Sequence, residues 1–211
     1  MTAKEFITKV KNLANYIEGH PDLELVDFTV GEPTPEEDIQ NAINAGVKDE
    51  SVLDFYRQTS SLVLLWNVEE EIALERYGIE ALYLSQGFAF LPLSSVIDTE
   101  YWKDFVWTED NQEHKPLHPF NVPSESEGDT FYIEEGKSYD KLDIYYVMFE
   151  VKAHKLPLNF SEYLDKLYQT KGFWYWQTMF TNEPDEETRS IVEANILSDL
   201  FEDFNPDYYK V

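Results

Sequence analysis

The sequence predicts an α+β fold, a single domain over residues 1–211 in which a mostly antiparallel β-sheet is flanked by N- and C-terminal helices. Helical patterns lie at the two ends of the chain, and segments with strand character lie between them. No internal repeat or linker-like stretch divides the sequence. Hydrophobic residues make up 43% of the chain and aromatic residues 16%, which is enough to form a core.

The N-terminal segment carries a complete set of helix signals. Thr2 and Glu5 have the spacing of a capping box, and Gly19 and Pro21 stop the helix. The apolar stripe that should face the core consists of Phe6, Val10, Leu13 and Ile17.

A short strand and a second helix are predicted next. Alternation with polar residues indicates the strand at Val26, Phe28 and Val30. The second helix is expected to have Thr34 as its cap, Pro35 at its first helical position and Glu37 closing the capping box. Gly46 should end it.

The middle of the chain predicts buried strands. Residues 52–56 form a short apolar turn, and residues 62–66 form a buried strand. Residues 68–78 fit either a strand or a short helix, and the pattern does not separate the two. Residues 82–93 return to strand character, with Gly87 marking a bulge or a close packing contact.

Beyond this strand, Asp98 can cap a short aromatic helix. Residues 109–129 are polar and contain three prolines, so we expect a long surface loop. Strands are predicted at 131–133 and 142–151, joined by a turn near 135–137.

The C-terminal third is predicted to be helical. Asn159 and Glu162 form a capping box, and a final helix starts near Pro184. The inward-facing residues of the two helices are Phe160, Tyr163, Leu164, Leu167, Tyr168, Ile191, Val192, Leu197, Leu200, Phe201 and Phe204.

Charge is the strongest functional signal in the sequence. The chain has 42 acidic and 16 basic residues, for a formal net charge of −26. Such a surface repels nucleic acid and anionic membranes and attracts basic partners over long range. We therefore expect a basic protein partner, and neither nucleic acid nor a membrane as a ligand.

Cysteine content and hydropathy predict a cytoplasmic location. There is no Cys, which excludes disulfides and thiolate chemistry. The N-terminus lacks the apolar run of a secretory signal, and the longest apolar runs are far shorter than the ~20 residues of a membrane span.

No catalytic, cofactor or metal site is predicted. Phosphate-binding glycine loops and the GxSxG elbow do not occur. His114 and His118 have the spacing of a helical metal pair, but prolines break any helix there, so both are expected to be solvated loop residues. Residues 125–129 could hold Ca²⁺ weakly, and a solvated loop is the simpler interpretation.

One segment combines acids with aromatics in a way that suits a cationic protein partner. Its candidate binding residues are Asp98, Glu100, Trp102, Asp104, Trp107, Glu109 and Asp110. The simpler alternative is a helix packed by its aromatics with solvated acids. If neutralising Glu100 and Asp104 left binding unchanged, the acidic final helix would be the next candidate surface.

Read in order, the elements resemble the SUKH superfamily over roughly residues 25 to 180. Residues 34–39 and 52–56 are similar to its early helix and its apolar "fY" element, and residues 62–66 match the strand that follows. Residues 87–96 resemble the next strand, and residues 159–164 resemble the opening of its last helix. The chain departs from the family at residues 48–51 and 59–61, where Leu-Pro and Asn-Gly are usual.

The resemblance implies a non-enzymatic binding domain. The superfamily includes bacterial immunity proteins that neutralise toxins, often nucleases, and yeast cell-wall-synthesis regulators. Three alternatives stay open: a regulatory or scaffold protein of the same fold, an enzyme with an acidic cleft acting on a cationic or sugar substrate, and a protein that imitates nucleic acid with rows of carboxylates in place of phosphates.

Overall fold

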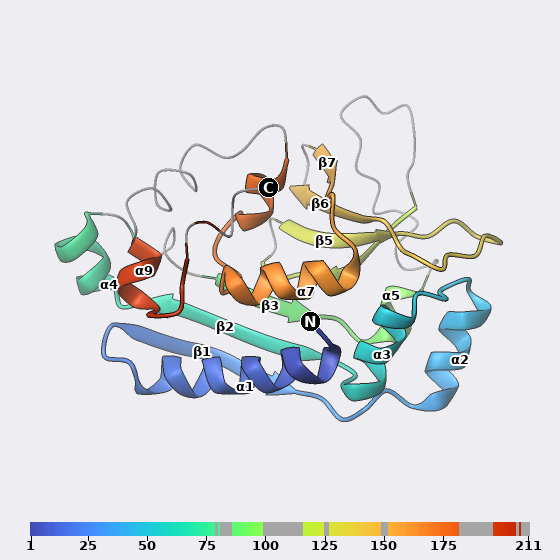
Figure 1. Ribbon diagram of the computed structural model, residues 1–211, viewed down its shortest axis with the longest axis horizontal. Helices are drawn as coiled ribbons and strands as arrows, with labels where there is room; N and C mark the ends of the chain where they lie inside the picture. The colour runs from blue at the N-terminus through green and yellow to red at the C-terminus, as the bar shows by residue number, and fades with distance from the viewer. Residues whose placement is uncertain are drawn as a thin grey trace.

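A seven-stranded antiparallel β-sheet forms the centre of the computed structural model (Figure 1). The structure describes residues 1–78, 80, 86–98, 116–124, 127–148, 152–181, 196–205 and 207. Each strand pairs with the next one in the chain. The strands are β1 (Leu23–Val30), β2 (Leu62–Val68), β3 (Gln86–Phe90), β4 (Leu117–Asn121), β5 (Glu127–Tyr132), β6 (Ile144–Met148) and β7 (Lys152–Lys155).

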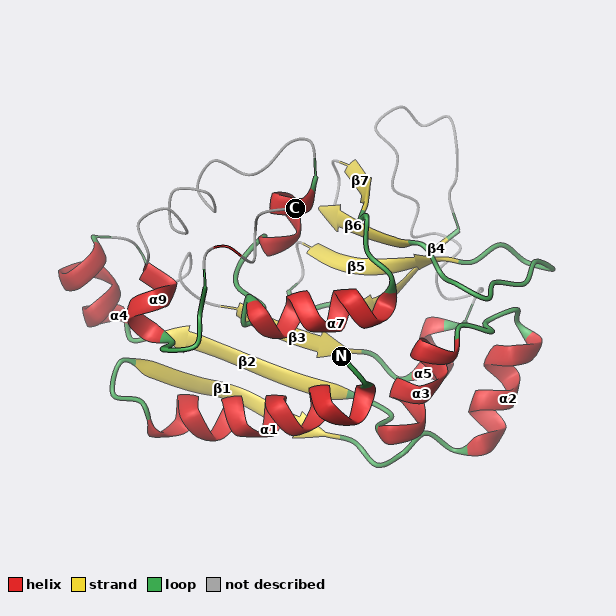
Figure 2. Cartoon of the chain, in the orientation of Figure 1, coloured by secondary structure: helices red, strands yellow, loops and turns green. Residues whose placement is uncertain are grey.

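Helices lie along the sheet and at its two ends, so the predicted α+β class is confirmed (Figure 2). α1 (Ala3–Gly19) and α7 (Phe160–Gln169) run along the sheet and contact each other. At one end lie α2 (Glu36–Asn44), α3 (Glu50–Gln58) and α5 (Leu93–Val96). At the other end lie α4 (Glu70–Ile72), the π-helix η1 (Ala73–Tyr77) and α9 (Ile196–Leu200). The 3₁₀ helix η3 (Trp176–Phe180) follows α7 in the chain.

The core is continuous from Ala3 to Phe204 and is rich in aromatic side chains. The predicted capping boxes of α1 and α7 are both present, and the predicted apolar stripes of these helices are buried except for Tyr168, which is half-buried. Phe120 of β4 and Phe131 of β5 stack with ring centroids 4.0 Å apart, and Phe160 of α7 packs on both. The two ends of the chain are thus tied to the sheet by one hydrophobic core.

The predicted start of α2 is wrong. Pro35 occupies the cap position in an extended conformation, and no side chain caps the helix. The N–H of Thr34 instead donates to the carbonyl of Tyr56 in α3 at 3.0 Å, so Thr34 is fixed by the neighbouring helix. The predicted turn at 52–56 is also wrong, because these residues belong to α3, which Asp49 caps through the N–H of Ser51.

The predicted surface loop at 109–129 is wrong where the structure describes it. β4 and the first residues of β5 fall in this range, and both lie inside the sheet. Pro119 is accommodated because the β4–β5 register shifts between Pro119 and Asn121. His118, expected in solvent, is 3% exposed and its Nδ1 lies 2.7 Å from the carbonyl of Val96. His114 lies outside the described residues.

The ambiguous segment 68–78 is resolved in favour of a helix. α4 continues directly into η1, and the left-handed Gly78 ends it. The next strand, β3, is shorter than predicted, since Leu93 already belongs to α5, and residues 81–85 lie outside the described residues. Gly87 is a close packing contact as expected, because a Cβ there would lie 1.8 Å from the carbonyl oxygen of Leu64.

The C-terminal predictions are confirmed in part. The predicted antiparallel pair is formed by β5 and β6, and β7, which the sequence did not indicate, pairs with β6. α9 buries Leu197 and Leu200, and Phe201 and Phe204 are buried just beyond its end. The predicted helix start near Pro184 lies outside the described residues. Among the described helices, none has the length and apolar character to cross a membrane.

Candidate protein-binding site

The acidic–aromatic segment singled out from the sequence lies almost entirely outside the described residues. Asp98 is described: it is exposed, and its N–H donates to the carbonyl of Ser95 just after α5. Glu100, Trp102, Asp104, Trp107, Glu109 and Asp110 are outside the described residues. The assignment of a binding role to this segment therefore stays a prediction.

A second acidic surface belongs to α4, η1, α9 and the residues beside them. These helices lie together at one end of the sheet (Figure 1). Segments of this surface are joined by an ion pair of 3.0 Å between Arg76 and Asp22 and by a hydrogen bond from the N–H of Glu69 to the carbonyl of Asp22. Leu74 lies beside Glu75 in η1, and its side chain is 50% exposed. We call this surface the acidic end; its acids are Asp22, Glu69, Glu70, Glu71, Glu75, Asp199, Glu202 and Asp203.

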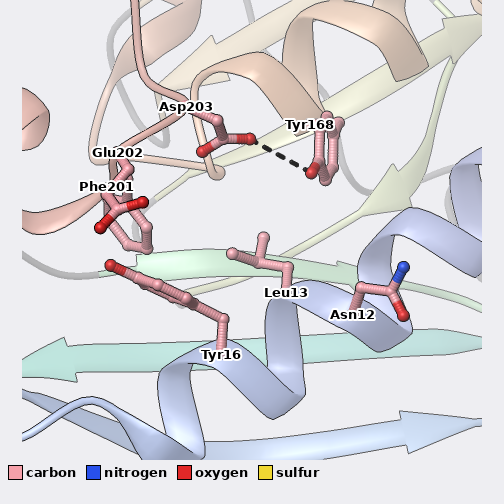
Figure 3. Close-up of a pocket in the computed structure, with 7 residues that line it drawn as sticks. All are labelled: Asn12, Leu13, Tyr16, Tyr168, Phe201, Glu202 and Asp203. Atoms are coloured by element: carbon pink, nitrogen blue, oxygen red, sulfur yellow. Dashed lines mark hydrogen bonds between the residues drawn. The ribbon is translucent and has the colours of Figure 1, made fainter.

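A pocket of about 210 Å³ opens beside this surface (Figure 3). α1 supplies one side, the end of α7 another, and the turn after α9 the third. Leu13 and Phe201 are buried, whereas Tyr16 is 37% exposed and Glu202 lies in solvent. The lining residues are Asn12, Leu13, Tyr16, Tyr168, Phe201, Glu202 and Asp203.

Tyr16 forms a fixed wall of this pocket although it is partly exposed. Its hydroxyl donates to the carbonyl of Leu200 at 2.7 Å, and its ring packs on Phe201 with centroids 5.9 Å apart. Burial raises the pKa of Tyr16, and the nearby carboxylates Glu202 and Asp203 raise it further. The phenol of Tyr16 is therefore neutral near neutral pH. Phe201 holds its ring in place, and the carbonyl of Leu200 holds its hydroxyl.

A buried lysine organises the acidic side of the pocket. Lys171 is 1% exposed and has a left-handed backbone (φ +59°). Its ammonium lies 2.8 Å from Oδ2 of Asp203 and above the rings of Tyr168 and Phe201, at 4.4 and 5.8 Å from their centroids. Burial lowers the pKa of Lys171, and Asp203 opposes that change. The hydroxyl of Tyr168 also donates to Asp203, at 3.3 Å.

The chemistry of this lining suits a cationic group. Aromatic faces and carboxylates attract ammonium and guanidinium groups, and a partly desolvated site strengthens that attraction. Glu202 makes no ion pair with the part of the chain that the structure describes. No group of three or more His, Asp or Glu residues within the described ranges is arranged to hold a metal ion.

A fully buried carboxyl group has a structural role. Asp129 in β5 is fully buried and accepts hydrogen bonds from Tyr163 (2.6 Å), Asn121 (2.9 Å) and Gln177 (2.9 Å). Burial raises its pKa to about 6, and the three donors act in the opposite direction. The expectation that this part of residues 125–129 is a solvated loop is wrong, because Asp129 links β4, β5, α7 and η3 inside the core.

Sequence reasoning did not assign the pocket. Tyr168 and Phe201 were expected to face the core, which is true of Phe201, and Tyr16 was given no role. The sequence pattern that points to this site is residues 201–204, where two acids lie between two aromatics. That pattern indicates an acidic turn at a core edge, but it does not indicate which helix packs opposite.

Comparisons with known proteins add no family assignment. No protein-family model matches the chain, and no curated protein matches its sequence.

Proposed function

We propose that the protein is a non-enzymatic protein-binding domain, and specifically a bacterial immunity protein that binds and neutralises a basic toxin. The observation that carries this proposal is the acidic end with the pocket beside it, where the partly exposed Tyr16 lies near the carboxylates of Glu202 and Asp203 and the partly exposed Leu74 shares η1 with Glu75. Aromatic or apolar anchors surrounded by charge are typical of residues that dominate binding energy in protein interfaces.

The pairing of the basic residues supports a cationic partner. In the described part of the chain, ion pairs of 4 Å or less join Arg57 to Glu50, Arg76 to Asp22, Lys137 to Glu134, Lys155 to Asp143 and Lys171 to Asp203. These cations are partly neutralised where they lie, while the chain keeps a net charge of −26. The resulting field attracts a basic protein and repels the phosphates of nucleic acid.

A toxin that acts on nucleic acid fits this field best. Enzymes that bind nucleic acid hold phosphates with Lys and Arg, so they present a cationic surface of the complementary sign. The resemblance of the sequence to the SUKH superfamily supports the same proposal. A bound acidic protein would neutralise such a toxin by covering its phosphate-binding surface.

Co-expression with a basic toxin domain encoded beside this gene tests the proposal. We expect the wild-type chain to protect cells from the toxin and to bind it with an association rate that falls steeply between low and physiological salt, while dissociation changes less. Absence of protection, together with absence of binding at low salt, would refute the proposed function.

A further inference from the structure

We infer that the pocket between α1, α7 and the turn after α9 receives a single lysine or arginine side chain of the basic partner. The inference rests on the proposed function and assigns a contact within it. At about 210 Å³, the pocket is smaller than the ~300–1,000 Å³ of sites for drug-sized ligands. It therefore suits one side chain rather than a cofactor.

The lining divides into parts that match the two halves of such a side chain. Leu13 and Phe201 form an apolar base against which a methylene stem can lie. Tyr16 offers a ring anchored by its hydrogen bond to Leu200. Glu202, exposed at the rim, supplies the carboxylate for the charged head.

Three lining side chains of the pocket, Asp203, Tyr168 and Phe201, already contact an ammonium group of the chain itself. Lys171 places its Nζ against Asp203, Tyr168 and Phe201 from the buried side. Lys171 donates a hydrogen bond to Oδ2 of Asp203, so this oxygen is already engaged. We therefore assign the ion pair with the partner's cation to Glu202 and a positioning role to Asp203. The partner's cation would thus enter from solvent on the opposite side of the same turn.

Lys9 of the chain itself competes with the partner's cation at this pocket. It is exposed on α1, and its Nζ lies 5.0 Å from the centroid of the Tyr168 ring. An incoming cation must displace this ammonium or tolerate its repulsion. Neutralising Lys9 should therefore strengthen binding, an outcome that a purely structural role for the pocket would not produce.

A titration with single-residue probes tests the inference directly. N-acetyl-lysine methylamide and N-acetyl-arginine methylamide are added to the ¹⁵N-labelled chain, with neutral N-acetyl-norleucine methylamide as the matched control. We expect weak, saturable shifts from the two cationic probes at the amides of Asn12, Tyr16, Phe201 and Glu202. The neutral probe should not produce them.

Three variants define the site. Glu202→Gln should lower the affinity for the cationic probes about tenfold, because one close charge pair is lost. Lys9→Gln should raise the affinity for these probes about threefold, because it removes the repulsion from one exposed positive charge. Glu32→Gln, an exposed acid in the loop between β1 and α2, should change affinity less than about twofold. Urea denaturation of each variant should match the wild type, because all three side chains are exposed.

Several results would overturn the inference: no saturable shifts at the pocket amides, equal shifts from the neutral probe, or equal weakening by Glu202→Gln and Glu32→Gln. These results are separable from failure of the proposed function. If the toxin binds equally well to wild type and Glu202→Gln, the pocket assignment fails and the function stands. If the probes saturate the pocket while the chain binds no basic toxin, the function fails and the cation pocket stands.

Discussion

Replacing Trp66 by alanine should destabilise the fold more than any other single large-to-small change in β2. The indole is fully buried and packs edge-on against Phe201 with centroids 5.2 Å apart. Its Nε1 donates to the carbonyl of Lys171 at 2.8 Å, so the residue links the sheet to the strained turn after α7.

The size of the effect follows from these contacts. Removing a buried tryptophan side chain costs about 3–5 kcal/mol through lost transfer free energy and the remaining cavity. The orphaned carbonyl of Lys171 adds about 1 kcal/mol or more. We therefore expect a loss near the upper end, about 5 kcal/mol, against a total stability of about 5–15 kcal/mol for a typical domain. Trp66→Phe keeps most of the ring packing and should lose about 1–2 kcal/mol.

Urea denaturation followed by circular dichroism measures both variants. The wild type, Trp66→Phe and Trp66→Ala should rank in that order of unfolding free energy, with little change in the dependence on urea. A loss below about 1 kcal/mol in Trp66→Ala would refute the placement of this side chain in the core.

The remaining predictions concern pH, backbone geometry and the segment outside the described residues. The folded chain should hold the proton of Asp129 up to a pKa of about 6, against an ordinary value of 3.8. Unfolding free energy should therefore fall by about 3 kcal/mol as pH rises from about 3 to about 7, and pH-dependent urea denaturation should show this step missing from Asp129→Asn. Gly87→Ala should lose about 3 kcal/mol or more in thermal unfolding, because its Cβ would lie 1.8 Å from the carbonyl oxygen of Leu64 at φ +118°; a wild-type melting temperature would contradict this. The double change Glu100→Gln with Asp104→Asn should weaken partner binding without lowering the melting temperature, and unchanged affinity would leave the acidic end as the binding surface.

Local signals were sufficient where a helix or strand is determined by its own residues. The capping boxes at Thr2 and Asn159 and the apolar run at residues 62–66 in β2 predict elements that the structure contains. The start of α2 failed for the opposite reason, because the backbone of Thr34 is held by Tyr56 in the next helix. A local sequence pattern does not predict contacts between distant segments.

The same limit explains the missed strands and the missed pocket. β4 reads as a loop because Pro119 and His118 are polar or strand-breaking types, yet a register shift and the carbonyl of Val96 accommodate them. The pocket joins Tyr16 to a turn that lies 184 residues further along the chain, at Leu200. Charge composition predicts a basic partner, which stays a prediction, and only the tertiary structure indicates where a cation could dock.

Affinity capture from the native host at low salt, followed by mass spectrometry, tests the central claim most directly. With the wild-type chain as bait, we expect recovery of a protein that carries a strongly basic domain and is released as the salt concentration rises. Recovery of only neutral or acidic proteins, or of a partner whose binding does not depend on salt, would contradict recognition of a basic partner by the acidic surface.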